Sequence, residues 1–218
     1  MRQEKRGLSS APIFHSHPFD VVAIAASAGG IPAIQYILSC LPADFPIPIV
    51  VVQHLAPSEQ HKSSLPKVLA CYTDLPVKWA EEAERCVGRC VYIAPQDHHL
   101  AVSPKGTFIL SRSEKINFAR PAADPLFESV AASFKERTVG VVLSGYYRDG
   151  AEGAKRIKGA GGRVIVQDKR TSFSFQMPNA TLCATEVDFV LPLEKIAAAL
   201  VSLVMAPGAA MLFRVTLP

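Results

Sequence analysis

The chain has 218 residues, which is enough for one large domain or two small ones. Hydrophobic residues make up 49% of it and charged residues only 19%, which excludes a largely disordered chain and supplies a sizeable core. The net charge of +4 is mild, and no run of Lys and Arg is interleaved with aromatic residues, so the sequence does not indicate a nucleic-acid-binding protein.

Apolar stretches are interrupted by proline or charge well short of the roughly 20 residues that span a bilayer, so we expect no direct membrane insertion. Five cysteines, an odd number, occur without a secretory signal, which predicts free thiols and a cytoplasmic location. Cys86 and Cys90 lie four residues apart, but no second cysteine pair or nearby histidine completes a zinc site. We therefore expect neither a metal nor a cofactor.

Along the chain, apolar runs alternate with segments of helical periodicity. Residues 1–18 are polar, basic and aperiodic, which predicts a flexible N-terminal tail. Strands are expected at 21–25, 48–53, 77–79, 90–93, 99–102, 108–111, 139–144, 163–167 and 189–191. Helices are expected at 32–41, 59–70, 125–135 and 151–158, from about 179, and at 194–203.

Continuous apolar strands separated by helices indicate an α/β fold. The predicted architecture is a three-layer, doubly wound, mostly parallel sheet covered by helices on both faces. The short strands in the middle of the chain are expected to form an antiparallel hairpin at one edge. No repeat or internal linker is evident, so one domain is predicted over 19–205, followed by an apolar C-terminal extension over 206–218.

Ser27 follows the apolar run VVAIAA and precedes a helix, which places it at the carboxyl end of a buried strand. Ligands bind at this edge of open α/β sheets, and amides at the start of a helix stabilise negative charge. Small neighbours at 26 and 28–30 leave the hydroxyl uncrowded. Ser27 is therefore a candidate nucleophile, and its alternative role is that of a helix N-cap.

His54 and Asp149 also follow buried strands. Strand ends of one sheet converge on a shared crevice, so these residues could supply the base and the orienting carboxylate of an acyl-transfer site. Alternatively, His54 bonds to backbone and Asp149 caps the helix after it. His98 and His99, in a loop that enters a short strand, compete with His54, whereas His15, His17 and His61 are poorer candidates.

Seven segments resemble, in order and spacing, the catalytic domain of the CheB family of chemotaxis-receptor protein-glutamate methylesterases, over about residues 20–203. These segments are IAASAGGIPAI, LPADFPIPIVVVQHLAPS, VYIAPQDHHLAV, RPAADPLFESVA, GVVLSGYYRDGAEG, GGRVIVQD and MPNATLCATEVDFVLPL. One such match would be weak evidence, but seven ordered matches are highly specific.

The resemblance implies hydrolysis of γ-glutamyl methyl esters on the helical cytoplasmic domain of chemoreceptors (EC 3.1.1.61). Many members of the family also deamidate receptor glutamines. It also implies that Ser27 is the nucleophile, His54 the base and Asp149 its partner. Oxyanion donors or substrate contacts are then expected around Ala28, Gly29, Tyr146 and Tyr147.

The sequence departs from the family pattern beside the expected site. Ala28 stands where threonine is frequent, and Gly145-Tyr146-Tyr147 replaces a G-M-G or G-T-G segment. Two bulky rings thus stand where a smaller side chain and a glycine are usual, which would reshape the substrate groove.

A second departure is the segment 121–124, which reads P-A-A-D where the family has P-S-V-D. Arg120, just before it, matches the family. This arginine is expected either to orient the substrate or to form an ion pair with Asp124.

The family usually carries a phosphorylatable receiver domain ahead of the esterase, and only about 18 residues precede the expected domain here. We therefore expect a stand-alone esterase that is unregulated or controlled by a separate regulatory protein. Its substrate is expected to be an acidic helical surface, attracted by basic residues near the site loops: Arg112, Lys115, Arg120, Arg148, Lys155 and Arg156.

Two alternatives stay open. The rings of Tyr146 and Tyr147 could close the groove and leave a binding module for a receptor or another partner, or the hydrolase could act on a different protein or a small ester. A nucleotide-binding role for the Ala28-Gly29-Gly30 segment is disfavoured, because the G-x-G-x-x-G spacing and its acidic ribose partner are missing.

Overall fold

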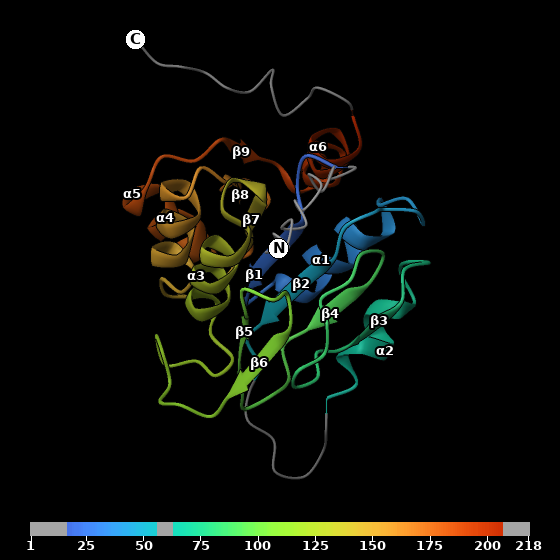
Figure 1. Ribbon diagram of the computed structural model, residues 1–218. Coiled ribbons are helices and arrows are strands. Elements are labelled where there is room, and N and C mark those ends of the chain that lie inside the picture. The colour runs from blue at the N-terminus through green and yellow to red at the C-terminus, as the bar shows by residue number, and fades with distance from the viewer. Residues whose placement is uncertain (1–16, 56–62, 207–218) are drawn as a thin grey trace, which may run out of the picture.

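Seven strands form one parallel sheet in the computed structural model, which describes residues 17–55 and 63–206 (Figure 1). The sheet has the order β3-β4-β2-β1-β7-β8-β9, and each adjacent pair is parallel. The strands are β1 (Val21–Ala26), β2 (Ile49–Gln53), β3 (Val77–Trp79), β4 (Val91–Ile93), β7 (Thr138–Val142), β8 (Arg163–Gln167) and β9 (Phe189–Leu191).

The central strand β1 shows why the strand sequences are continuously apolar. Its side chains alternate between two separate cores, with Val22 and Ile24 in one and Val21 and Ala23 in the other, and all are fully buried. This alternation follows from the two-residue period of a strand, and both faces must be apolar because both are covered.

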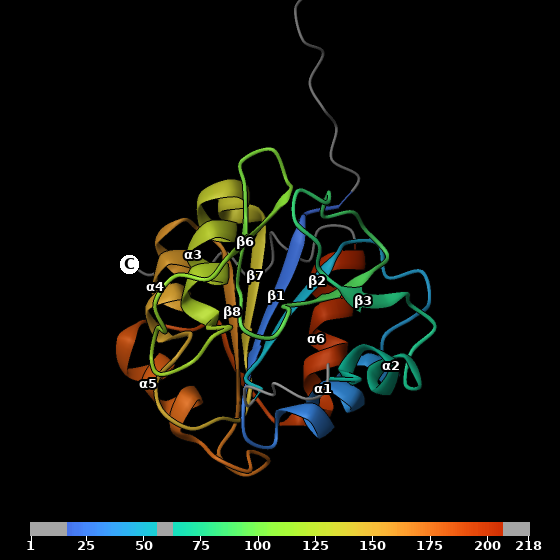
Figure 2. The ribbon, with the colours of Figure 1, turned by 90° about the horizontal axis from the view of Figure 1, so that it is seen from below.

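Helices cover the two faces of the sheet, as Figure 2 shows. One face is covered by α1 (Gly30–Ser39), α2 (Leu65–Ala70) and α6 (Leu193–Met205). The other is covered by α3 (Ala123–Phe134), α4 (Ala151–Gly159) and α5 (Gln176–Ala184), and a 3-10 turn, η1 (Lys135–Arg137), follows α3. The predicted three-layer α/β architecture is confirmed.

The antiparallel hairpin consists of β5 (His99–Val102) and β6 (Phe108–Ser111) and forms a sheet of its own rather than an edge of the main sheet. It packs beside α3, where the Val102 amide donates to Ser129 Oγ at 2.9 Å. Phe108 also lies edge-on to Tyr92 of β4, with ring centroids 4.8 Å apart. The hairpin thus covers the part of this face that holds β4, while β3 and β4 pair in parallel within the main sheet.

Two helices begin earlier than their periodicity predicts. α3 starts two residues before Pro125, and α5 starts at Gln176 rather than near 179, with Pro178 in its first turn. Proline is tolerated in a first turn because amides there have no intrahelical partner, so each helix extends ahead of its proline. The expected helix at 59–70 is described only from Leu65 onward, and residues 1–16, 56–62 and 207–218 lie outside the described residues.

The strand order creates a switch point beside β1. From β1 the chain passes to β2, then to β3 at the edge of the sheet and back to β4, and later places β7 on the opposite side of β1. Connections that leave adjacent strands in opposite directions open a crevice at the carboxyl ends of those strands. Within residues 17–55 and 63–206, no helix is long and apolar enough to span a membrane.

Candidate active site

Ser27 is the first residue after β1, and its backbone is fixed from both neighbouring sides. Its amide donates to the Ser144 carbonyl at 3.0 Å, and its carbonyl accepts from the amide of Gly30 at 2.9 Å. The N-cap of α1 is Gly29, which has a φ of 75° and no side-chain cap. The N-cap role considered for Ser27 is therefore wrong, and its hydroxyl is not used to start the helix.

Two glycines make room for this turn. Gly29 adopts a left-handed φ, and a Cβ there would collide with Phe173. A Cβ at Gly145 would lie 2.8 Å from the Ser27 Cβ and would also collide with the Met177 sulfur. Glycine at both positions lets the loops after β1 and β7 approach each other around the serine.

His54 follows β2 and is tied to the end of β1, because its amide donates to the Ala26 carbonyl at 2.9 Å. Its ring Nε2 lies 2.7 Å from Asp149 Oδ2, which leaves Nδ1 as the nitrogen available to a nucleophile. The structure thus joins the predicted histidine and aspartate by a direct contact. The alternative in which the His54 ring bonds to backbone is wrong.

Ser27 and His54 line the same hollow, of about 260 Å³. Residues 17–55 and 63–206 offer the Ser27 hydroxyl no hydrogen-bond partner, so the serine and histidine share the hollow without a bond between them. Catalytic hydrogen bonds of this kind often tighten only when substrate is present.

Asp149 is fully buried, and its carboxylate accepts from both amides that open α3: Ala123 at 2.6 Å and Asp124 at 3.2 Å. Asp149 thus accepts from the first amides of α3, which lies earlier in the sequence. The expected N-cap role at α4 is wrong, because the N-cap of α4 is Gly150. Burial by itself would raise the pKa of Asp149. The hydrogen bond and positive charge of His54, with the Ala123 amide, lower that pKa below its usual range. The carboxylate therefore stays ionised beside the imidazole.

The partly buried Asn117 and the buried Asp124 complete this hydrogen-bonded group, and the sequence did not identify either as part of it. Asn117 Nδ2 donates to Asp124 Oδ2 at 2.9 Å and to Asp149 Oδ1 at 3.2 Å. Burial raises the pKa of Asp124 to about 6, although the Gly153 amide donates to it, and the nearby Asp149 charge raises it further. One amide thus holds two carboxylates, of which only Asp149 touches the histidine.

Asp124→Asn tests the raised pKa of Asp124. When the pKa of a carboxyl group is higher in the folded protein than in the unfolded chain, its protonation stabilises the fold. This contribution is complete below pH 4 and is lost as the pH rises to about 6. From pH 4.5 to 7.5, the wild-type free energy of unfolding should therefore fall relative to that of the variant by on the order of 1–3 kcal/mol. Urea titrations of both proteins at the two pH values measure the difference, and parallel pH profiles would contradict the assignment.

Gln53 is a third residue of the site that the sequence did not single out, and it is buried. Its Nε2 donates to the carbonyls of Ser27 at 2.9 Å and His54 at 3.0 Å, so it joins the two loops that carry the proposed nucleophile and base. A glutamine that ends an otherwise apolar strand was the available signal, since a buried amide needs partners.

Gln53→Leu should therefore lower kcat by about 10- to 100-fold, because a small misplacement of reacting groups is costly. Two orphaned carbonyls should also lower the free energy of unfolding by about 1–3 kcal/mol. Ester hydrolysis and urea denaturation check the two effects, with Thr138→Val as the control, because this buried hydroxyl at the start of β7 donates to the Val130 carbonyl at the opposite edge of the sheet. Unchanged kcat in the destabilised variant would limit Gln53 to a structural role.

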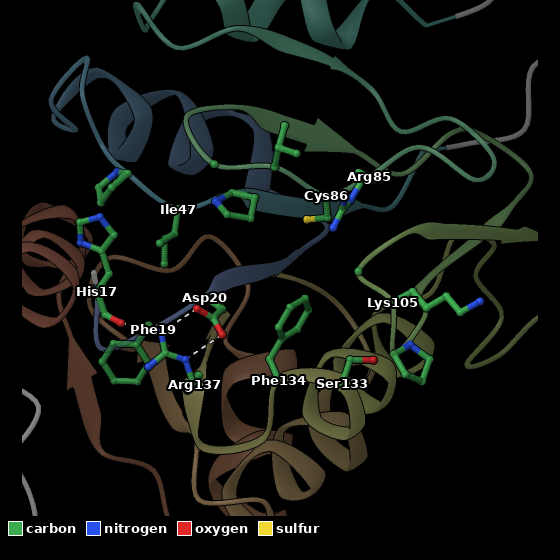
Figure 3. A pocket seen from close by; sticks show the side chains of 16 residues that line it. His17, Phe19, Asp20, Ile47, Arg85, Cys86, Lys105, Ser133, Phe134 and Arg137 are labelled. Atoms are coloured by element: carbon green, nitrogen blue, oxygen red, sulfur yellow. Dashed lines mark hydrogen bonds and ion pairs between the residues drawn. The ribbon is translucent and has the colours of Figure 1, made fainter. Parts of the chain in front are cut away.

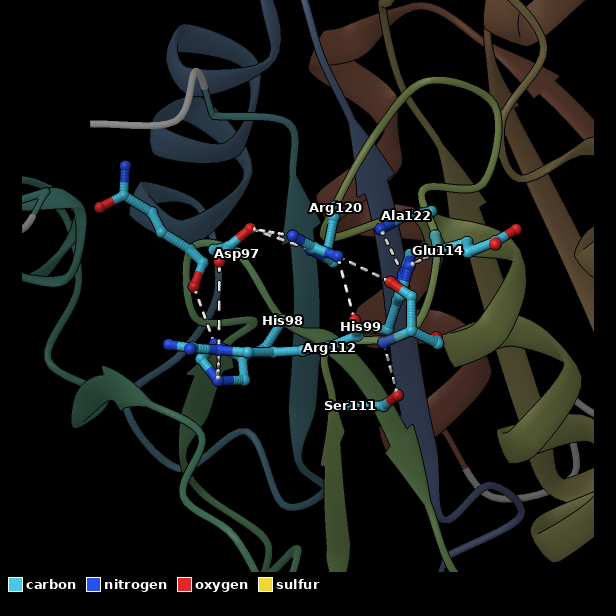
Figure 4. A network of polar contacts seen from close by, with 10 residues as sticks. Asp97, His98, His99, Ser111, Arg112, Glu114, Arg120 and Ala122 are labelled. Carbon is cyan, nitrogen blue, oxygen red and sulfur yellow. Dashed lines mark hydrogen bonds and ion pairs between the residues drawn. The ribbon is translucent and has the colours of Figure 1, made fainter. Parts of the chain in front are cut away.

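Arg120 lines the same hollow as Ser27 but pairs with Asp97 and not with Asp124 (Figure 4). Its Nη2 and Nε lie 2.6 and 2.9 Å from Asp97 Oδ1, and Nη1 donates to the carbonyls of Arg112 and Ser113. The expected ion pair with Asp124 is wrong because Asp124 is already satisfied by amide donors.

The two competing histidines serve other contacts. His98 bonds the Gln96 carbonyl and accepts from Arg112 Nε at 3.0 Å. His99 is buried, bonds the Glu114 carbonyl and accepts from the Ala122 amide (Figure 4). His15 and His61 lie outside the described residues. His54 is thus the histidine that the structure brings together with Ser27.

The amide groups around Ser27 differ in availability. The Tyr147 amide donates to Gln176 Oε1 at 2.9 Å and is occupied. The amides of Ala28, Gly29 and Tyr146 have no acceptor within residues 17–55 and 63–206. These three amides are available to a developing negative charge, and Tyr146 is the one of the three residues that lines the hollow of Ser27, whereas the Tyr147 amide is occupied.

A larger hollow, of about 800 Å³, lies elsewhere, toward the amino ends of the strands (Figure 3). His17, Cys86, Lys105 and the ion-paired Asp20 and Arg137 are among its lining residues. It contains no residue of the Ser27 site. In the described part of the chain, no three His, Cys, Asp or Glu side chains are grouped to hold a metal ion.

The fold and this site together define an α/β protein with a serine and a histidine–aspartate pair at the carboxyl edge of a parallel sheet, the constellation of serine hydrolases. Comparison with known proteins narrows this class. The family model described as CheB methylesterase matches residues 22–200, and the chain belongs to that family.

Named relatives agree with this assignment. A Leptospira interrogans protein is 41% identical over 82% of this chain and 92% of its own length. The Thermotoga maritima and Pyrococcus horikoshii proteins named protein-glutamate methylesterase/protein-glutamine glutaminase are 41% and 42% identical over 84% and 80% of this chain. The chain spans about half the length of these two relatives, 54% and 48% respectively.

A solved structure supports the same conclusion. The crystal structure of the Thermotoga maritima CheB methylesterase catalytic domain superimposes with a TM-score of 0.80 at 40% sequence identity. The match covers 85% of this chain and 98% of that domain. The predicted family and fold are therefore confirmed.

Proposed function

We propose that the protein is a protein-glutamate methylesterase that hydrolyses γ-glutamyl methyl esters on the cytoplasmic domain of chemoreceptors. The single observation that carries this proposal is that Ser27 and the His54–Asp149 pair meet at one hollow, with 2.7 Å between His54 Nε2 and Asp149 Oδ2. The names of the relatives supply the substrate class.

In the first step, His54 Nδ1 takes the proton of Ser27 as the Ser27 oxygen attacks the ester carbonyl. The tetrahedral intermediate then expels the methoxy group, which receives the proton from the His54 imidazolium and leaves as methanol. A γ-glutamyl ester of Ser27 remains. Throughout, Asp149 holds the ring orientation and stabilises its positive charge, which its lowered pKa favours.

In the second step, water attacks the acyl-enzyme while His54 takes its proton. The second tetrahedral intermediate expels the Ser27 oxygen, which receives that proton from His54, and the glutamate carboxylate is released. The amides of Ala28 and Tyr146 are the proposed donors to the oxyanion in both tetrahedral intermediates, and each such donor typically contributes about 100- to 1000-fold to the rate. With a glutamine substrate, the same sequence releases ammonia and would produce the glutaminase activity named in the relatives.

The substrate partner is a helical protein surface, so an open hollow is suitable. The hollow at Ser27 measures about 260 Å³, and Tyr146 and Tyr147 line it with 46% and 62% of their surface exposed. A cytoplasmic location follows from this partner and is part of the proposal. Control by a separate regulatory protein is the corresponding proposal for regulation.

Methanol release from a methylated chemoreceptor cytoplasmic fragment tests the proposed function. Wild-type protein should release methanol, and Ser27→Ala should not. Receptor binding without methanol release from either protein would favour a binding module. Hydrolysis of a small activated ester, with neither receptor binding nor methanol release, would show a hydrolase whose natural substrate is a different ester.

A further inference from the structure

A tight hairpin turn at the rim of the hollow carries an unexpected side chain. Ile116 and Ala119 exchange two backbone hydrogen bonds, of 3.1 and 2.9 Å, so Asn117 and Phe118 are the central residues of a two-residue loop. Both have positive φ, 50° and 65° respectively. Loops with positive φ at both central residues strongly favour Asn followed by Gly. Here the second position holds phenylalanine.

Tyr147, in the loop after β7, is a second bulky residue with a positive φ, and its ring contacts that of Phe118. It has a φ of 66°, which glycine would adopt more easily. Its ring and that of Phe118 lie 5.9 Å apart at 48°, yet the two residues are 62% and 85% exposed. These rings therefore add little to the core. Unfavourable backbone conformations persist mainly where a functional site retains them.

Two hollows adjoin at the ring pair. One is the hollow of Ser27 and His54, and the other, of about 670 Å³, is lined by Lys115, Asn117, Phe118, Tyr147 and Arg148. Lys115, Asn117, Phe118 and Tyr147 line both hollows, and Arg148 lines only the second of the two. Lys115 and Arg148 form no ion pair within residues 17–55 and 63–206, so two cationic side chains face this second hollow uncompensated by a described carboxylate.

We propose that Phe118 and Tyr147 form a substrate clamp, and that the hollow beyond them binds a second, unesterified acidic side chain of the same substrate protein between Lys115 and Arg148. The proposal rests on the proposed function. The rings pack against the methylene groups that join the two substrate side chains to their backbone, while the cations pair with the carboxylate. On a helical substrate, a residue three or four positions from the esterified glutamate lies on the same face and can reach the second hollow.

Two synthetic helical peptides test the acidic subsite. Each carries one glutamate γ-methyl ester, flanked at three and four residues on either side by glutamates in one peptide and by glutamines in the other. Wild-type protein should show a kcat/KM about tenfold higher for the glutamate-flanked peptide, equivalent to one well-placed charge contact. The Lys115→Gln/Arg148→Gln double variant should reduce this ratio to about one.

Lys105→Gln is the matched charge control, since Lys105 lines the hollow at the opposite edge of the sheet and should leave the ratio unchanged. Equal wild-type rates for the two peptides, with Ser27-dependent methanol release, would overturn the acidic subsite and leave the proposed function intact. No methanol from either peptide would overturn the proposed function and this inference with it.

Phe118→Gly tests the clamp separately from folding. Glycine fits the left-handed turn, so the melting temperature should equal or exceed that of wild type, while KM for both peptides rises about tenfold. A lower melting temperature with unchanged KM would assign Phe118 a structural role and overturn the clamp. Tyr72→Gly, at an exposed aromatic residue beyond α2, serves as the control for loss of a surface ring.

Discussion

Ser27→Ala should reduce methanol release from the methylated receptor fragment by about 10⁴-fold or more, because removal of a nucleophile leaves only binding and oxyanion stabilisation. The same loss is expected with a small activated ester. The melting temperature should stay within about 2 °C of the wild-type value, because deleting one hydroxyl away from any cap or core contact costs little. The described structure gives the Ser27 hydroxyl no hydrogen bond to lose.

The paired measurements separate two roles for the same residue. Loss of turnover at constant melting temperature identifies a nucleophile, whereas a comparable loss of stability would identify a structural serine. Ser39→Ala supplies the control, since this exposed serine on α1 bonds to the Tyr36 carbonyl and to Cys40 near the end of its own helix. Retained turnover in Ser27→Ala would show that Ser27 is not the attacking group.

The positions of Ser27, His54 and Asp149 could be predicted because each depends on backbone topology. An apolar run fixes where a strand ends, and parallel strands of one sheet end at one edge. The register of β1 with β2 and β7 then brings together residues that lie more than 90 positions apart in the sequence. Periodicity and strand order carry that information without any side-chain detail.

The partners of those residues could not be predicted in the same way. Asn117 contacts Asp149 from a turn whose position depends on how a long loop folds. Arg120 pairs with Asp97 rather than with Asp124, although Asp124 is closer in the sequence. Such contacts depend on side-chain directions in irregular segments, which have no period. The hairpin was misplaced for a related reason, because its pairing was predictable but the surface against which it packs was not.

Asp149→Asn should lower turnover by about 10³- to 10⁴-fold, because the amide can neither stabilise the imidazolium nor hold the required tautomer of His54. Unlike Ser27→Ala, it should also destabilise the fold. The buried carboxylate accepts hydrogen bonds from two amides of α3, from Asn117 and from His54. Asparagine presents a donor where one carboxylate oxygen was, so at least one buried partner is orphaned at a cost of about 1–3 kcal/mol.

The pH dependence of that loss follows from the lowered pKa of Asp149. A carboxyl group with a pKa lower folded than unfolded contributes its stability above pH 4 and loses it as the pH falls through its folded pKa. The difference in unfolding free energy between wild type and Asp149→Asn should therefore be largest near neutral pH and shrink as the pH falls below about 4. Urea titrations at pH 7 and at pH 3 measure this difference.

Asp188→Asn is the matched control, because Asp188 is also a largely buried carboxylate, held by Lys158 Nζ at 2.8 Å and the Val164 amide at 2.7 Å. It lies beside the amino end of β8, away from Ser27, so the variant should lose stability while retaining turnover. If both aspartate variants lost stability and both retained turnover, Asp149 would be a structural cap of α3. Loss of turnover in Asp149→Asn alone assigns the carboxylate to the chemistry of His54, since the cost of an orphaned buried amide is common to both.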